Sequence, residues 1–143
     1  MGYTADLLDG IAGLISGAGL AVYRPTGIYT PAETGIVFSV MPDTPDRIVC
    51  LSTYPVEDPD LSDAITGIQI RLRASRDPRD VNDLADDLLD LLHNRQAEQM
   101  GSAWVALLWR QSQALMGQDE HGRMELAANY YARTTRSAPN LYE

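Results

Sequence analysis

The chain has 143 residues, of which 45% are hydrophobic, and it carries a formal net charge of -9 at pH 7. A chain of this length suits one globular domain with a modest core. The acidic balance argues against a nucleic-acid-binding domain, because such domains usually present a basic surface.

All 11 basic residues are arginine, and the chain contains no lysine. Two explanations remain open. One is the codon bias of a GC-rich genome; the other is use at interfaces, where the guanidinium forms bidentate pairs with carboxylates. Either way, Schiff-base and P-loop chemistry are excluded, since both need lysine. The single Cys50 lies in the apolar run IVCLS, so we expect a buried thiol and no intramolecular disulfide.

The first predicted element is a helix near residues 5–18. Thr4 is the expected N-cap, and Gly19 is the expected stop. Apolar residues repeat at helical spacing between them: Leu7, Leu8, Ile11, Leu14 and Ile15. The apolar stretch 10–22 has no basic flank and is too short to span a bilayer, so we expect neither a secretory signal nor a membrane helix.

Short strands follow this helix. Residues 20–24 predict one strand, and residues 25–34 predict a loop with two prolines. Alternating apolar residues predict a second strand at 35–41. The turn PDTPD at 42–46 separates it from a third strand at 47–54, and we expect these two strands to form an antiparallel hairpin.

The stretch 65–94 changes its period in the middle. Its first part alternates, with Ile68, Ile70 and Leu72 on one face and Gln69, Arg71 and Arg73 on the other. Asp77 and Pro78 then predict the N-cap and first turn of a second helix, which ends near His93. Its apolar stripe is Val81, Leu84, Ala85, Leu88, Leu91 and Leu92, and its opposite face carries Asp83, Asp86, Asp87 and Asp90.

The remaining residues predict two more strands, at 104–110 and 124–134, with a polar loop at 116–123. Trp104 and Trp109 are five positions apart, so a regular strand would place them on opposite faces. The order of elements predicts an α+β fold: a mostly antiparallel four- to six-stranded sheet with two helices packed on one face. We expect one domain over residues 1–136 and a flexible C-terminal tail at 137–143.

The sequence shows no catalytic, cofactor-binding or metal-binding residues. Asp119, Glu120 and His121 are consecutive, which is typical of a solvated turn rather than a chelating set. His93 has a structural explanation, because a helix C-terminus favours a cationic side chain. Asp77, Asp80 and Asp83 do not have the spacing of a calcium-binding loop. Ser52 and Ser112 do not lie in a nucleophile-elbow motif. We therefore expect a protein that is not an enzyme.

Three passages carry a resemblance to a known family: PDTPDRIVCLSTYP, TGIQIRLRASRDPRDVNDLADDLLDLLHN and LLWRQSQALMGQDEHGRMELAANYYART. With the first helix they cover residues 5–136. The chain resembles the tail terminator or minor capsid proteins of long-tailed (siphovirus-type) bacteriophages. These passages are patterns of fold and turn rather than a catalytic signature.

The resemblance implies a structural virion protein that needs no cofactor. Such a subunit forms a ring, a homohexamer, at the head-proximal end of the tail tube. The ring ends tube polymerisation and joins the tail to the neck, so the implied partners are other copies, the tail tube protein and a neck or head-completion protein. DNA passes through the channel without specific binding, and no membrane is involved. The implied location is the virion, after assembly in the host cytoplasm.

A closed ring needs a head-to-tail contact between two different surfaces of one subunit. Arg71, Arg73 and Arg76 are candidates for one surface, and Asp83, Asp86 and Asp90 of the next subunit for the other. Pairing within one chain, or plain solvation, is an equal alternative, because surface ion pairs are common and weak. Other roles also stay open: a neighbouring stopper or adaptor in the neck, a minor capsid component, or a small ligand-binding domain or enzyme with a pocket between sheet and helices.

Overall fold

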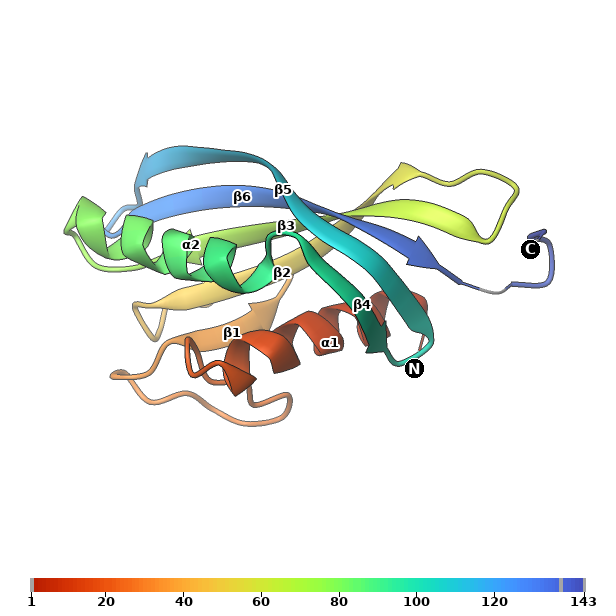
Figure 1. Ribbon diagram of the computed structural model, residues 1–143. Coiled ribbons are helices and arrows are strands. Elements are labelled where there is room, and N and C mark those ends of the chain that lie inside the picture. Colours follow the sequence, from red (N-terminus) through yellow and green to blue (C-terminus); the bar gives the residue numbers. More distant parts are fainter. Residues whose placement is uncertain (1, 137, 143) are drawn as a thin grey trace.

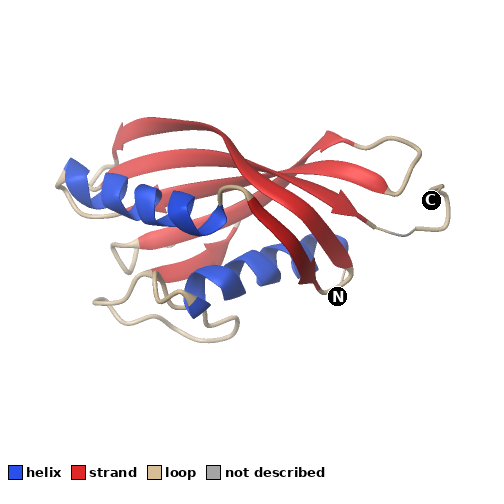
Figure 2. Ribbon diagram, viewed as in Figure 1, coloured by secondary structure: helices blue, strands red, loops and turns tan. Residues whose placement is uncertain are grey.

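The computed structural model describes residues 2–136 and 138–142. Two helices, α1 (Tyr3–Gly17) and α2 (Pro78–Leu92), pack on one face of a six-stranded sheet that curls around them (Figure 1). The strands are β1 (Gly35–Phe38), β2 (Ile48–Glu57), β3 (Asp63–Arg73), β4 (Arg95–Met100), β5 (Ala103–Gln118) and β6 (Met124–Thr135). The predicted α+β class is confirmed, with helices and sheet in two layers (Figure 2). We call the helix-covered side of the sheet the inner face and the other side the outer face.

The sheet is mixed rather than wholly antiparallel. Its order is β1-β2-β3-β6-β5-β4, and every pairing is antiparallel except β1 with β2, which is parallel. The predicted antiparallel hairpin of 35–41 with 47–54 is therefore wrong. Two parallel strands that follow each other in the chain usually need a long connection, because the chain must return to the end at which the first strand began. Strand β1 has only four residues, so the chain returns over only about 13 Å before β2 begins. Residues 39–47 cover this path.

The end signals of the two helices differ in how well they could be predicted. Asp77 caps α2 as expected, since its side chain accepts a hydrogen bond from the backbone N–H of Arg79, and Pro78 follows as the first helical residue. The predicted cap of α1 at Thr4 is wrong. That helix begins at Tyr3, and the carbonyl of Gly2 accepts the N–H of Asp6 at 2.9 Å.

The core lies between the helices and the inner face. From α1 it takes Leu7, Ile11 and Ile15, and from α2 it takes the predicted stripe, of which Leu91 is only partly buried. The sheet contributes alternate residues such as Leu51, Ile68, Ile70, Leu126 and Tyr130. Cys50 is buried and free, as expected. Among the described residues, none of the helices is both long enough and apolar enough to cross a membrane.

Strand β4 was not predicted, because its sequence, RQAEQM, is mostly polar and partly exposed at the edge of the sheet. Strand β5 was predicted as 104–110 but continues to Gln118, which includes the first three residues of the loop expected at 116–123. Residues 111–118 are mostly exposed, so no alternation of apolar residues marks them. Residues 20–24 form no strand; Val22 makes only an isolated bridge with Gly35.

The two tryptophans lie on the same face, which corrects the prediction of opposite faces. Trp104 pairs with Thr135 and Trp109 with Tyr131, and both partners belong to the outer-facing set of β6. The register shifts between Val105 and Leu107, which inserts one extra residue into β5. A β-bulge of this kind reverses the alternation beyond it.

The described part of the predicted tail, residues 138–142, folds back against the loop between β2 and β3. The backbone N–H of Ser62 donates to the carbonyl of Tyr142 at 2.7 Å, and the backbone N–H of Tyr142 donates to the carbonyl of Asp60 at 2.8 Å. Ser137 and Glu143 lie outside the described residues. Flexibility of the tail stays a prediction.

Candidate subunit interface

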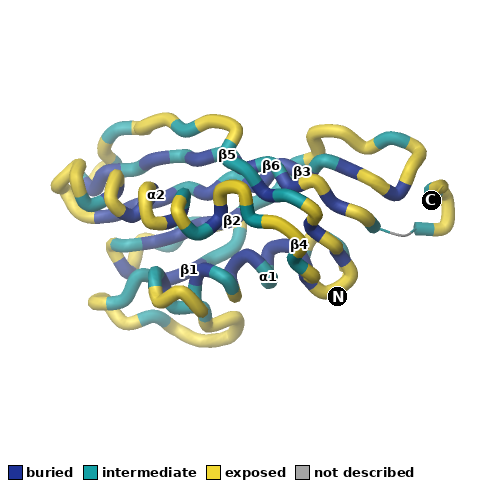
Figure 3. The backbone as a smooth tube through the Cα atoms, in the orientation of Figure 1, coloured by how far each residue is buried: buried dark blue, intermediate teal, exposed yellow. Residues whose placement is uncertain are grey.

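The exposed side of α2 is acidic. Asp83, Asp86, Asp87 and Asp90 are all exposed, while most of the apolar stripe of the same helix is buried. Figure 3 shows buried and exposed positions following one another along α2. The helical period places the two sets on opposite sides. Within the described residues no ion pair involves any of these four carboxylates; the pairs at this helix are Arg79 with Asp77 and Arg47 with Asp80. We call Asp83, Asp86, Asp87 and Asp90 the acidic helix face.

Arg71 lies on the outer face of β3 and is paired within the chain. Its Nη2 lies 2.7 Å from Oε1 of Glu125 on β6, and its Nε donates to the same oxygen at 3.0 Å. The arginine side chain keeps 43% of its surface exposed, so this pair is a surface ion pair. Such pairs contribute about 0–1 kcal/mol and can exchange partners.

Arg73 is buried, with 4% of its surface exposed. Its guanidinium donates to the backbone carbonyls of Asp46 at 2.9 Å, Pro45 at 2.7 Å and Asp43 at 3.2 Å. All three carbonyls belong to the segment 39–47 that connects β1 to β2, so Arg73 anchors this crossover on the outer face. Burial, and then the nearby charge of Arg123, lowers the pKa of Arg73.

Arg123, which the sequence interpretation missed, also anchors this segment. It lies just before β6, is 8% exposed, and pairs with Asp119 at 2.8 Å, Asp43 at 3.0 Å and Asp46 at 3.0 Å. Asp119 and Arg123 are four positions apart across a turn, so their ion pair could have been predicted from the sequence. The pairing with Asp43 and Asp46 joins residues about 80 positions apart in the chain and had no signal in the sequence.

Arg76 is exposed, and its Nε donates to the carbonyl of His121 at 3.2 Å. No ion pair within the described residues joins Arg71, Arg73 or Arg76 to Asp83, Asp86 or Asp90. Arg71 and Arg73 lie on the outer face of the sheet, whereas the aspartates lie on α2 beyond the inner face. One subunit therefore does not bring the two predicted sets together.

Aromatic side chains gather in the middle of the outer face. The rings of Trp109 and Tyr131 meet edge to face with centroids 5.8 Å apart, and the guanidinium carbon of Arg133 lies 6.0 Å from the Trp109 ring. Tyr54 lies over Gly67 and donates its hydroxyl to Asn129 at 3.3 Å. The sequence interpretation missed this group, because its members come from β2, β5 and β6 and meet only through the sheet register.

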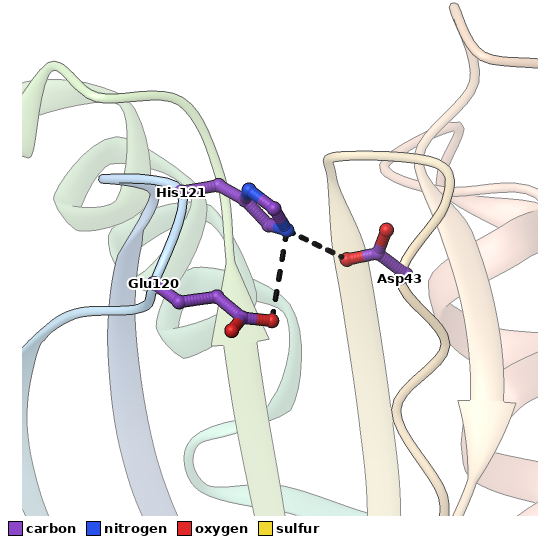
Figure 4. A group of neighbouring side chains, drawn as sticks. All are labelled: Asp43, Glu120 and His121. Carbon is purple, nitrogen blue, oxygen red and sulfur yellow. Dashed lines mark ion pairs between the residues drawn. The ribbon is translucent and has the colours of Figure 1, made fainter.

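Two loops bring Asp43, Glu120 and His121 together, as Figure 4 shows. Nε2 of His121 lies 3.4 Å from Asp43 and 3.6 Å from Glu120, and all three residues are exposed. Such a set could hold a divalent cation or act as an ion-pair cluster between loops. Asp119 is separate from it, since its carboxylate accepts hydrogen bonds from the backbone of His121 and Arg123. The turn is exposed, as expected, but its His121 also lies beside Asp43 of another loop, a contact that the sequence did not indicate.

The groups considered for catalysis have structural partners. Nδ1 of His93 accepts the N–H of Arg110 at 2.9 Å, and Oγ of Ser112 accepts from Asn129 at 3.2 Å. A surface hollow of about 510 Å³ is lined mainly by charged side chains, among them Arg71, Arg73 and Arg123. These arginines are already bound to carboxylates or carbonyls of the same chain. The hollow is thus a charge-paired surface rather than a set of free polar groups.

Comparisons with known proteins bear on these surfaces. A family model described as "Bacteriophage tail terminator protein" matches residues 14–136. A solved structure described as "Virion of native gene transfer agent (GTA) particle" contains a similar chain, with 14% sequence identity and a TM-score of 0.64. The similarity covers 94% of this chain and 99% of that chain, and at this identity it shows a shared fold. The comparison with curated proteins found no match.

Proposed function

Because the chain belongs to the bacteriophage tail terminator protein family, and is thus a phage tail structural protein, we propose that it forms a ring at the head-proximal end of the tail tube. The ring, a homohexamer, ends polymerisation of the tube and joins the tail to the neck. Its role is structural, with no catalytic step. Its partners are other copies of itself, the tail tube protein and a neck or head-completion protein. Assembly takes place in the host cytoplasm before the subunit becomes part of the virion.

The acidic helix face is the observation that carries the proposal of self-assembly. Four carboxylates lie along two turns of α2, and none of them has an ion-pair partner within the described residues. Like charges at this spacing repel one another and destabilise an isolated helix. A cationic surface on a neighbouring subunit would remove that repulsion.

The predicted contact of Arg71, Arg73 and Arg76 with Asp83, Asp86 and Asp90 is refined by the geometry of the arginines. Arg73 is buried in its own chain, and Arg71 already holds Glu125. Arg76 is exposed and bound only to a carbonyl, so of these three it is the one most able to reach a neighbouring carboxylate. In this proposal Arg73 does not contact the neighbour; it fixes the position of the segment 39–47 through its hydrogen bonds to the backbone carbonyls there.

DNA passes through the ring without specific binding in this proposal. The chain carries 20 acidic and 11 basic residues, so its overall field repels phosphates. A channel that repels the DNA backbone lets it pass without adhering, since phosphate contacts supply most non-specific affinity.

Native mass spectrometry and negative-stain electron microscopy of the purified protein test the ring. A six-fold species with a central channel is the expected result, and a stable monomer at micromolar concentration would contradict the proposal. The second measurement mixes the rings with polymerising tail tube protein. Tubes capped at one end, with growth stopped, distinguish a terminator from a stopper or adaptor, which would bind the head-completion protein but leave tube growth unchanged.

A further inference from the structure

The outer face presents a compact patch that the fold leaves uncovered. We define the outer aromatic patch as Tyr54, Trp109, Tyr131 and Arg133. Both helices lie on the inner side of the sheet, so no helix covers this patch (Figure 2). Tyr54, Trp109 and Tyr131 are partly exposed and Arg133 is exposed. Tryptophan, tyrosine and arginine are the residues that most often carry the binding energy of protein interfaces.

The patch carries a positive charge without an internal partner. Within the described residues Arg133 makes no ion pair, and its guanidinium lies over the Trp109 ring at 6.0 Å. A neighbouring aromatic surface excludes water on one side of the guanidinium, which strengthens any pairing with a carboxylate brought to the other side. Arg71, which lies on the same face, is already held by Glu125.

We propose that the outer aromatic patch of one subunit binds the acidic helix face of the next copy, with Arg133 contacting Asp86 and Asp90. This inference rests on the proposed ring. It replaces Arg76 with Arg133 as the cation that meets the acidic helix face, because Arg133 lies opposite Ile65 near the start of β3 and Arg76 lies beyond its end. Charge complementarity supports it: four unpaired carboxylates meet an unpaired arginine. The sizes also match. Residues 83–90 span about 10 Å along a helix, and the patch crosses three strand spacings from Tyr54 on β2 to Trp109 on β5, about 14 Å.

The placement of the two surfaces makes the contact head-to-tail. The acidic helix face points away from the sheet on the inner side, and the patch lies on the outer side. Two different surfaces on opposite sides of one subunit cannot form a two-fold symmetric dimer through this contact. They build a ring if the rotation closes, or a filament if it does not.

Two charge-reversed variants test the contact in trans. Arg133→Glu alone sets a carboxylate against the acidic helix face, and Asp86→Arg with Asp90→Arg alone sets arginines against Arg133. Each variant alone should remain monomeric, with association weakened at least ~10-fold, since opposed like charges cost several kcal/mol. An equimolar mixture should assemble again. In an alternating ring the introduced glutamate meets the introduced arginines, and the native Arg133 meets the native aspartates. Such a ring holds equal numbers of both variants, which native mass spectrometry resolves.

The controls separate the possible failures. Asp58→Arg changes an exposed carboxylate in the β2–β3 loop and should leave the ring intact, and circular dichroism should show that every variant is folded. A monomeric wild-type protein would overturn both the ring and this contact. Two results would overturn this contact alone, provided that the wild-type protein forms rings. One is that both charge-reversed variants still form rings by themselves. The other is that each variant fails alone and the mixture fails as well. Arg133→Glu rings that form but no longer bind tail tube protein would show that the patch binds the tube instead.

Discussion

Arg73 and Arg123 donate to the same atom, the carbonyl oxygen of Asp43, at 3.2 and 2.6 Å. The two arginines come from β3 and from the turn before β6, and both are buried. Together they hold the segment 39–47 that lets the short strand β1 lie parallel to β2. Two guanidinium groups are tolerated side by side because Asp43, Asp46 and Asp119 surround Arg123.

Arg73→Leu should therefore destabilise the fold rather than only the ring. The substitution leaves the backbone carbonyls of Pro45 and Asp46 without their donor, whereas the carbonyl of Asp43 keeps its bond from Arg123. Hydrogen bonds to a charged group contribute about 1.5–3 kcal/mol each. We expect a loss of about 2–4 kcal/mol in the free energy of unfolding, measured by urea denaturation. Arg71→Gln, which removes a surface pair, should cost at most about 1 kcal/mol. Equal effects of the two substitutions would show that Arg73 does not anchor the crossover.

Gly10→Ala should disturb the packing of α1 on β4. A Cβ at Gly10 would lie 2.5 to 2.8 Å from Cγ, Cβ and Sδ of Met100, which is itself buried. We expect a loss of about 1–3 kcal/mol from overpacking. Gly13→Ala is the matched control, because nothing lies within 4 Å of its added Cβ. That change should stabilise the helix by about 0.5–1 kcal/mol. Thermal unfolding of both variants gives the comparison, and a loss at both positions would argue against the contact.

Tyr130→Phe should leave the protein as stable or raise its stability by about 1 kcal/mol. Among the described residues the hydroxyl of Tyr130 is buried without a hydrogen-bond partner. Burial raises the pKa of Tyr130 to about 12. Phenylalanine fills the same space without the buried hydroxyl. Denaturant titration checks the stability, and a loss above about 1 kcal/mol would reveal a partner for the hydroxyl in solution.

The carboxyl of Glu33 should titrate far below its usual range. Hydrogen bonds from Arg24, and then from the backbone of Thr30, lower the pKa of Glu33 from 4.5 to about 2. A lowered pKa means that this pair stabilises the loop fully above pH 4.5, and that its contribution falls as the pH drops toward 2. Carbon-detected NMR titration gives the midpoint. Arg24→Gln should move the midpoint back toward 4.5, and an unchanged midpoint would exclude the pair as its cause.

Local signals in the sequence determined the parts whose physics is local. Asp77 and Pro78 with the apolar stripe of 81–92 defined α2 almost to the residue, because capping and helical period depend on neighbours within a few positions. The alternation at 65–73 and 124–134 likewise identified β3 and β6. The same periods placed the carboxylates of α2 on its exposed side, and within the described residues these form the one predicted set that stays free of ion pairs.

Only the tertiary structure decided what depends on long-range pairing. The parallel register of β1, the bulge that turns both tryptophans outward, and the burial of Arg73 all arise from contacts between distant segments. An arginine on an alternating strand has the same local pattern whether solvent or a crossover loop covers it. For that reason the sequence indicated Arg71 and Arg73 as equals, while the fold buried one and left the patch around Arg133 open.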